Sequence, residues 1–132
     1  MPRIYLDNAA TSWPKPESVY RAADDYQRRL GAPAGRGAYT EASEAERIVL
    51  SCRKKIADLI NLGDPTRIIF TQNGTDSLNL ALHGILRPGD HVITTVCEHN
   101  SVLRPLSFLA ERGITTTYVP CDGQGYIDPA DI

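Results

Sequence analysis

Lysine is scarce in this chain, which has only Lys15, Lys54 and Lys55 among its 132 residues. Lys15 falls in a proline-rich loop, and the other two lie off or at the edge of the apolar stripe of a predicted helix. Lys54 and Lys55 are therefore expected in solvent. A lysine that acts as a nucleophile needs a desolvated setting, and none of the three positions offers one.

Cysteine is also sparse, with Cys52, Cys97 and Cys121 spread widely along the chain. An odd number of cysteines at wide spacing is a poor disulfide framework. Residues 97–99, Cys-Glu-His, have the side chains of a metal site, but no second Cys-x-x-Cys or His-x₃-His pair completes a set of four ligands. The sequence therefore predicts no metal centre.

An excess of positive charge and a long apolar run are both missing. Lysine and arginine total 14 against 16 acidic residues, for a net charge of −2. This balance argues against a nucleic-acid or membrane-surface role. No apolar run approaches the roughly 20 residues that cross a bilayer, and the first residues do not resemble a signal peptide. A cytoplasmic location is therefore expected by default, and the length of the chain predicts one domain.

The first half of the sequence has helical periodicity. A short strand is expected over residues 3–6, and a helix over 16–30 that Gly31 ends. Residues 31–39 are rich in helix breakers and are expected to be irregular. A second helix is expected over 41–60. Its predicted apolar stripe, in which the cysteine fills the core, consists of Ala45, Ile48, Val49, Cys52, Ile56, Leu59 and Ile60.

The second half alternates between strands and helices. Strands are expected over 67–71, 91–96 and 114–119, and helices over 75–86 and 101–112. This order and spacing are typical of parallel strands joined by helical crossovers, so the fold class is α/β. The helix side chains expected to point inward are Leu78, Ala81, Leu82, Ile85, Val102, Leu103, Leu106, Leu109 and Ala110.

Two polar loops follow predicted strands, at the strand ends where open parallel sheets bind ligands. In the first loop, Gly74 allows close backbone approach and Thr75 offers a hydroxyl at a helix start, a pattern that suits a phosphate. Asn73 and Asp76 also fit an ordinary helix cap, which the loop alone favours. In the second loop, His99 offers a flat ring for stacking and a proton-transfer group, or it merely caps a helix.

Together these segments resemble the class V aminotransferase family of pyridoxal-phosphate enzymes, particularly its cysteine desulfurases. Residues 5–11 (YLDNAAT) are similar to the opening of these enzymes, and residues 70–80 (FTQNGTDSLNL) to their phosphate-loop segment. Residues 89–101 resemble the segment with the stacking histidine, and residues 35–39 resemble a loop before the second helix. The motifs follow in order across nearly the whole chain.

The resemblance implies a fold as well as a cofactor. Residues 1–40 would be an N-terminal arm, helix and loop. Residues 41–132 would be the first part of the cofactor-binding large domain, with the start of a mainly parallel sheet. The family works as a homodimer with active sites near the subunit interface, and Arg36 with its loop would serve that interface.

The resemblance also implies roles for particular residues. Gly74 and Thr75 would bind the phosphate of pyridoxal 5'-phosphate, with Asp76 beside them at the helix start. His99 would stack on the pyridine ring and help to move protons. The substrate pocket would lie near Asn8 and Ala9.

Several functional residues of the family match no position in this chain: the cofactor-bonding lysine, the persulfide-carrying cysteine, the aspartate at the pyridine nitrogen and the carboxylate-binding arginine. Cys97 and Cys121 do not match the motif of the nucleophile. Gly74 stands where many members carry alanine. Asp128 and Pro129 read as a helix start at the chain end, so the sequence is expected to be a truncated piece. Without the lysine and the nucleophile it is expected to be inactive, and with an incomplete sheet it is expected to have low stability by itself.

The function implied is cysteine desulfurase. L-cysteine would lose its sulfur to an enzyme thiolate, leaving L-alanine and a persulfide for a possible acceptor protein. A selenocysteine lyase or another class V enzyme would share these motifs. Two further alternatives are a non-catalytic module that holds a phosphorylated small molecule at Thr75, and a purely structural or interaction fragment.

Overall fold

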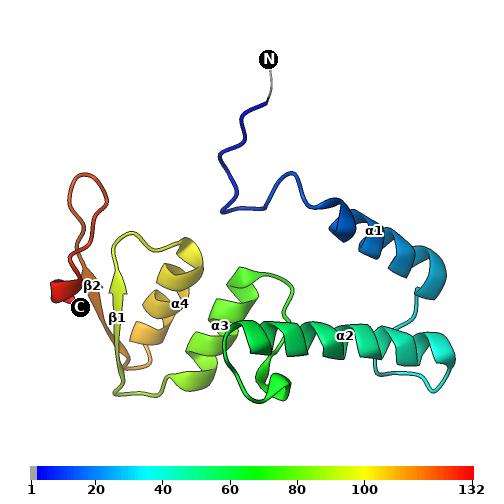
Figure 1. Ribbon diagram of the computed structural model, residues 1–132. Coiled ribbons are helices and arrows are strands. Elements are labelled where there is room, and N and C mark those ends of the chain that lie inside the picture. The colour runs from blue at the N-terminus through cyan, green and yellow to red at the C-terminus, as the bar shows by residue number, and fades with distance from the viewer. Residues whose placement is uncertain (1–2) are drawn as a thin grey trace. The chain divides into compact units, whose positions relative to one another are not determined.

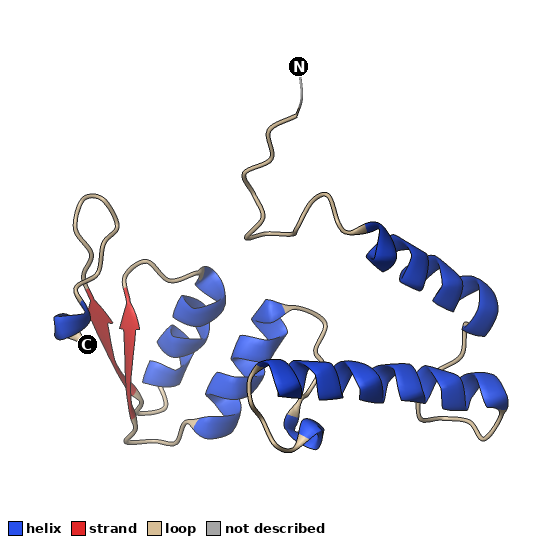
Figure 2. Cartoon of the chain, in the orientation of Figure 1, coloured by secondary structure: helices blue, strands red, loops and turns tan. Residues whose placement is uncertain are grey.

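A computed structural model describes residues 3–132, which divide into two compact units. The first unit ends at Ile68, and the second runs from Ile69 to Ile132. Within the described residues, the first unit contains only helices and loops, whereas both strands belong to the second (Figure 1, Figure 2). The domain division expected at residue 40 stays a prediction.

The first unit is built from helices. α1 (Glu17–Asp25) continues into a π-helical turn, η1 (Tyr26–Leu30), which ends where Gly31 adopts a left-handed φ of 53°. α2 (Thr40–Leu59) follows the irregular loop, and a short 3₁₀ turn, η2 (Pro65–Arg67), comes next. Both helices predicted for this half of the sequence are confirmed.

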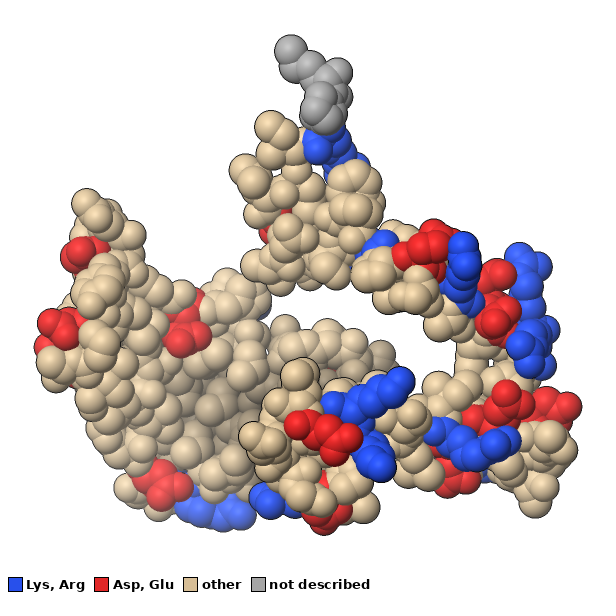
Figure 3. Space-filling model, in the orientation of Figure 1, with Lys and Arg blue, Asp and Glu red and all other residues tan. Residues whose placement is uncertain are grey.

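Charged side chains on α1 and η1 pair one turn apart. Figure 3 shows both signs of charge intermingled along the helical part of the chain rather than gathered into a field of one sign. Exposed pairs of this kind contribute only about 0.3–0.5 kcal/mol each, so they mark a solvated face. The pairs are Arg21–Glu17 at 3.2 Å, Arg28–Asp24 at 2.7 Å and Arg29–Asp25 at 3.9 Å.

The second unit combines helices with a small sheet. Its elements are α3 (Gly74–Ile85), β1 (His91–Thr95), α4 (Asn100–Ala110), β2 (Thr115–Val119) and a final 3₁₀ turn, η3 (Pro129–Asp131). The two strands are parallel and paired in register along their whole length. α4 contacts both α3 and β2. The α/β class expected from the sequence is confirmed.

The larger buried side chains lie in the second unit. Four of them are at most 3% exposed: Leu106 and Leu109 on α4, Ile114 just before β2, and Val119 at the end of β2. The buried apolar residues described in the first unit are all alanines, Ala32, Ala42, Ala45 and Ala57. Because hydrophobic stabilisation grows with the apolar area removed from water, the stronger core is that between α4 and the sheet.

Two predicted strands are not strands in the structure. Residues 3–6 are irregular, and residues 68–71 follow η2 without entering the sheet, although Ile68 has the extended dihedrals φ −82° and ψ 119°. A strand needs a partner for its backbone N–H and C=O groups, and the sheet of the described residues contains only β1 and β2. The predictions for residues 91–96 and 114–119 are confirmed.

Several predicted inward side chains are exposed instead. Leu59 is 83% exposed, Ile85 is 73% exposed, and Cys52, expected in the core, is also exposed. Periodicity indicates which side chains share a helix face, but whether another element covers that face depends on the rest of the fold. None of the helices within residues 3–132 is both long and apolar enough to cross a membrane.

Candidate functional site

The loop before α3 is held by its own side chains. The Asp76 N–H donates to the Asn73 side-chain oxygen at 2.9 Å, and the Ser77 N–H donates to the Asn73 carbonyl at 3.1 Å. The Thr71 hydroxyl also donates to the Asn73 carbonyl, at 3.0 Å. Asn73 is therefore the N-cap that the sequence suggested, and it fixes where α3 begins.

Two backbone donors at this helix start have no acceptor in the described part of the chain. The cap uses the N–H groups of Asp76 and Ser77, whereas those of Gly74 and Thr75 and the Thr75 hydroxyl make no hydrogen bond within residues 3–132. Both residues are exposed. Free N–H groups at the positive end of the helix dipole suit an anion, so capping and phosphate binding are compatible here.

Gly74 and Asp76 differ in what they offer to a phosphate. A β-carbon added at Gly74 would meet no atom within 4 Å, so alanine fits this position and its backbone is open to a ligand. The Asp76 N–H is already used by the cap, and an ionised carboxylate offers no donor. Asp76 therefore offers the phosphate no hydrogen bond from its backbone N–H or its carboxylate, and its place beside the phosphate stays a prediction.

His99 is the N-cap of α4. Its Nδ1 accepts a hydrogen bond from the Ser101 N–H at 3.1 Å and lies 2.9 Å from the Ser101 hydroxyl. Because a backbone N–H can only donate, Nδ1 carries no proton, and the neutral ring carries its proton on Nε2. Ser101 itself is buried, with 7% of its surface exposed. The ring is thus held at one nitrogen, while Nε2 makes no hydrogen bond to the described residues.

The two loops meet at one cavity of about 380 Å³ in the second unit. Thr75 and His99, each at the start of a helix, both line it. A volume of this size accepts a small cofactor. The remaining lining residues come from α3 and α4 and are Asn79, His83, Asn100, Ser101, Arg104, Pro105 and Phe108.

Asn8 and Ala9, predicted near the substrate, lie in an exposed turn of the first unit. The Asn8 side-chain oxygen accepts a hydrogen bond from the Trp13 N–H at 3.3 Å. Their role at the substrate stays a prediction.

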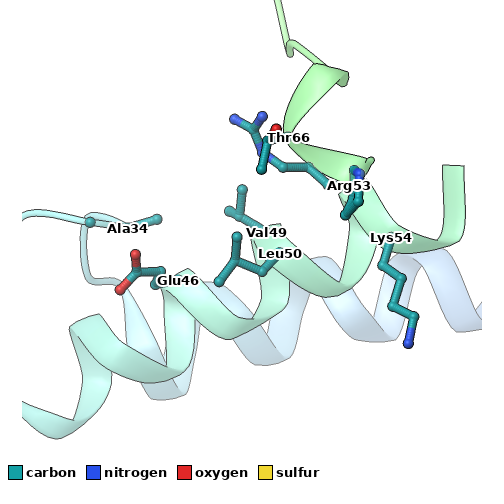
Figure 4. A pocket seen from close by; sticks show the side chains of 9 residues that line it. Ala34, Glu46, Val49, Leu50, Arg53, Lys54 and Thr66 are labelled. Atoms are coloured by element: carbon teal, nitrogen blue, oxygen red, sulfur yellow. The ribbon is translucent and has the colours of Figure 1, made fainter. Parts of the chain in front are cut away.

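The first unit has a separate cavity of about 490 Å³ above α2, with Val49 and Leu50 as its apolar floor and Glu46, Arg53 and Lys54 along the helix (Figure 4). The loop before α2 and the η2 turn complete its lining with Ala34, Gly35, Pro65 and Thr66. Asn8 and Ala9, the residues of the first unit that are predicted near the substrate, do not line this cavity.

The three lysines lie where the sequence places them. Lys54 and Lys55 are exposed on α2. Lys15 lies in the N-terminal loop and is half-buried, and its Nζ donates to the Thr11 hydroxyl at 3.2 Å and to the Ser12 carbonyl at 3.0 Å. All three belong to the first unit, and the second unit, which contains the cavity shared by Thr75 and His99, has no lysine.

Two features of the second unit escape sequence reasoning. The first is the hydrogen bond between His99 and Ser101. Its only signal in the sequence is weak: the two residues are two positions apart, the spacing that an N-cap side chain bridges. Cys97 and Cys121 lie 24 residues apart, yet their sulfur atoms are 3.1 Å from each other. The register of β1 with β2 brings these two together, and sequence spacing does not reveal a register.

The cap function of His99 gives a testable prediction. Replacing His99 with alanine leaves the Ser101 N–H without its acceptor and should lower the free energy of unfolding by about 0.5–2 kcal/mol. Asparagine at the same position can accept this hydrogen bond and should retain most of that stability. Urea unfolding of the two variants and the wild type measures the difference, and an equal loss in both would show that the cap contributes nothing.

Comparison with known proteins agrees with these features. The sequence profile of the family described as aminotransferase class-V matches residues 4–132. A probable cysteine desulfurase of Methanothermobacter thermautotrophicus is 37% identical over 130 residues, which cover 98% of this chain and 32% of the relative. The cysteine desulfurase IscS of Dictyoglomus turgidum is also 37% identical, over 98% of this chain and 33% of its own length. The chain thus spans about a third of these curated relatives.

Solved structures show the same likeness. The apo structure of a cysteine desulfurase from Thermococcus onnurineus superposes with a TM-score of 0.82 at 34% identity, over 97% of this chain and 32% of that one. A cystine C-S lyase in complex with its reaction product, cysteine persulfide, has a TM-score of 0.65 at 25% identity, over 80% and 28% of the two chains. With the profile match across almost every residue, the resemblance found in the sequence is confirmed, and the chain belongs to the aminotransferase class-V family.

Proposed function

We propose that residues 3–132 form the part of a cysteine desulfurase that binds the phosphate and the ring of pyridoxal 5'-phosphate. In the proposed reaction L-cysteine becomes L-alanine, and its sulfur passes to an enzyme thiol as a persulfide. The observation that carries this proposal is that Thr75 and His99, expected at the phosphate and at the ring, line the same cavity. The reaction class comes from the names of the relatives.

The residues of this chain would divide the work as follows. The unbonded N–H groups of Gly74 and Thr75 and the Thr75 hydroxyl would hold the phosphate at the positive end of α3. Bound pyridoxal phosphate supplies an electron sink for the substrate's α-carbon. His99, oriented through Nδ1 by Ser101, would face the ring and hold or pass a proton at Nε2.

The proposal extends to partners that the family resemblance implies. Asn8 and Ala9 would lie near the pocket for L-cysteine, and the loop that carries Arg36 would serve the interface with a second copy of the protein. A sulfur-acceptor protein would take the persulfide sulfur. A cytoplasmic setting fits this reaction, and a selenocysteine lyase or another class V activity would differ from it only in substrate.

One observation favours a second candidate function, a module that binds a phosphorylated ligand without a covalent bond. The second unit, which contains the cavity of Thr75 and His99, has no lysine among its residues 69–132. Residues 3–132 by themselves are therefore not expected to bond the cofactor or to turn over L-cysteine.

Borohydride reduction of the protein isolated from its source cells separates the two candidates. Reduction fixes pyridoxal phosphate permanently to a lysine, and the intact mass then shows the adduct. The desulfurase proposal predicts an adduct in the protein from the cells, and L-alanine formed from L-cysteine before reduction. A mass without an adduct, together with reversible binding of pyridoxal phosphate, would replace the desulfurase proposal with the binding module.

A further inference from the structure

The ends of β1 and β2 bring two thiols together beside the candidate site. The last registered pair of the strands is Thr95 with Val119, and the Val96 N–H donates to the Val119 carbonyl at 3.0 Å. Two residues beyond each member of that pair stand Cys97 and Cys121, so the two cysteines continue the register past the end of the sheet.

The geometry of the two cysteines suits a covalent bond. Their sulfur atoms are 3.1 Å apart, with the Cys97 thiol donating to the Cys121 sulfur. Neighbouring strands lie about 4.7–4.9 Å apart, which is within the range of about 4.4–6.8 Å between Cα atoms that a disulfide spans. Cys97 is exposed and Cys121 half-buried, so a small oxidant can reach the first while the second stays beside it.

The turn after Cys121 holds that residue in place. The Asp122 side-chain oxygen accepts hydrogen bonds from the N–H groups of Gln124 and Tyr126, each at 2.8 Å, and the Asp122 N–H donates to the Tyr126 carbonyl at 2.9 Å. The N–H groups of Tyr126 and Gln124 hold the pKa of the Asp122 carboxyl below its usual value. The position of Cys121 opposite Cys97 is thus supported on both sides, by β2 and by this turn.

We propose that Cys97 and Cys121 are a dithiol modification site that closes to an intrachain disulfide by exchange with a small-molecule disulfide of the glutathione class. The site lies two residues before His99, on the connection that leads from β1 to α4. This proposal goes beyond the proposed desulfurase function and does not require it.

The exchange takes two balanced steps. The Cys97 thiolate attacks one sulfur of the small disulfide, forms a mixed disulfide and releases one small thiolate. The Cys121 thiolate then attacks the Cys97 sulfur, forms the Cys97–Cys121 bond and releases the second small thiolate. The protein gives up two electrons and two protons, and the small disulfide is reduced to two thiols.

The state of the Cys97 thiol sets the rate of the first step. The hydrogen bond to Cys121, followed by desolvation and the nearby Glu98 carboxylate, raises the pKa of the Cys97 thiol above its usual value. The thiolate is the attacking species, so exchange at Cys97 is slower near neutral pH than at an ordinary exposed cysteine.

The test uses the wild-type protein and oxidised glutathione, followed by alkylation of the remaining thiols and peptide mapping. Cys52 serves as the internal control, because the three cysteines can form three different disulfides and two of these include Cys52. In an unfolded chain, loop closure alone favours the Cys97–Cys121 pair over the other two by roughly 2.5- to 5-fold. In the native protein we expect the Cys97–Cys121 disulfide to be favoured by more than about tenfold over each pairing with Cys52. In denaturant this preference should fall to the value set by loop closure alone.

Variants complete the design. Cys52→Ser should form the disulfide as the wild type does, whereas Cys97→Ser and Cys121→Ser should stop at a glutathione adduct. Native pairing no more selective than in denaturant, or glutathione adducts that persist on both cysteines of the wild type, would overturn the proposal. The comparison of native with denatured wild type does not depend on how the variants fold, and neither result bears on whether the protein binds pyridoxal phosphate.

Discussion

Replacing Leu106 with alanine should lower the free energy of unfolding of the second unit by about 2–5 kcal/mol. Leu106 has 0% of its surface exposed and lies on α4, the helix that contacts both α3 and β2. Its truncation removes apolar contact area and leaves a cavity in a core whose other large members are few. Urea unfolding, monitored by a signal from the second unit, measures the change.

Leu80→Ala is the matched control for this experiment. It makes the same chemical change on α3, where Leu80 is 54% exposed. Substitutions at such positions usually change stability by no more than about 0.5 kcal/mol. If both variants lost the same stability, the core of the second unit would not lie between α4 and the sheet.

Replacing Thr75 with alanine should weaken binding of pyridoxal 5'-phosphate by about 10- to 100-fold. The hydroxyl of Thr75 makes no hydrogen bond to the described residues, so the phosphate is the acceptor we assign to it. A hydrogen bond to a charged group contributes about 1.5–3 kcal/mol, and each 1.4 kcal/mol is about tenfold in Kd. Equilibrium dialysis with the cofactor measures the affinity.

Two controls isolate the phosphate contact. Thr40→Ala removes an exposed threonine from the start of α2, outside the cavity of Thr75 and His99, and should leave the affinity unchanged. Pyridoxal, which lacks the phosphate, should bind the wild type and the Thr75 variant equally. Equal losses for pyridoxal and its phosphate would place Thr75 away from the phosphate.

The helices were predictable because local signals determine them. Gly31 ends the first helical segment with a left-handed φ, and Asn73 begins α3 by accepting the Asp76 N–H, as their residue types indicate. The strand expected over residues 67–71 was not realised because strand formation depends on a partner elsewhere. The exposure of Cys52 has the same origin, since periodicity defines a face without showing what covers it.

Part of the candidate site was also predictable, because local sequence signals place its residues at the starts of helices. Gly74, Thr75 and His99 were identified from their positions after predicted strands. Only the strand before His99 forms, but the structure still brings Thr75 and His99 to one cavity. The sequence left open whether His99 caps a helix or serves a ligand, and the geometry allows both, because Nδ1 caps while Nε2 stays unbonded. The pairing of Cys97 with Cys121 needed the register of β1 and β2.

The most direct test of the account is nuclear magnetic resonance of the protein during titration with pyridoxal 5'-phosphate. The amide resonances of Gly74 and Thr75 and the ring resonances of His99 should shift together, whereas inorganic phosphate should shift the two amides alone. Shifts confined to Val49 and Leu50 in the cavity of the first unit, or a titration that leaves Gly74 and Thr75 unchanged, would contradict the proposed cofactor site.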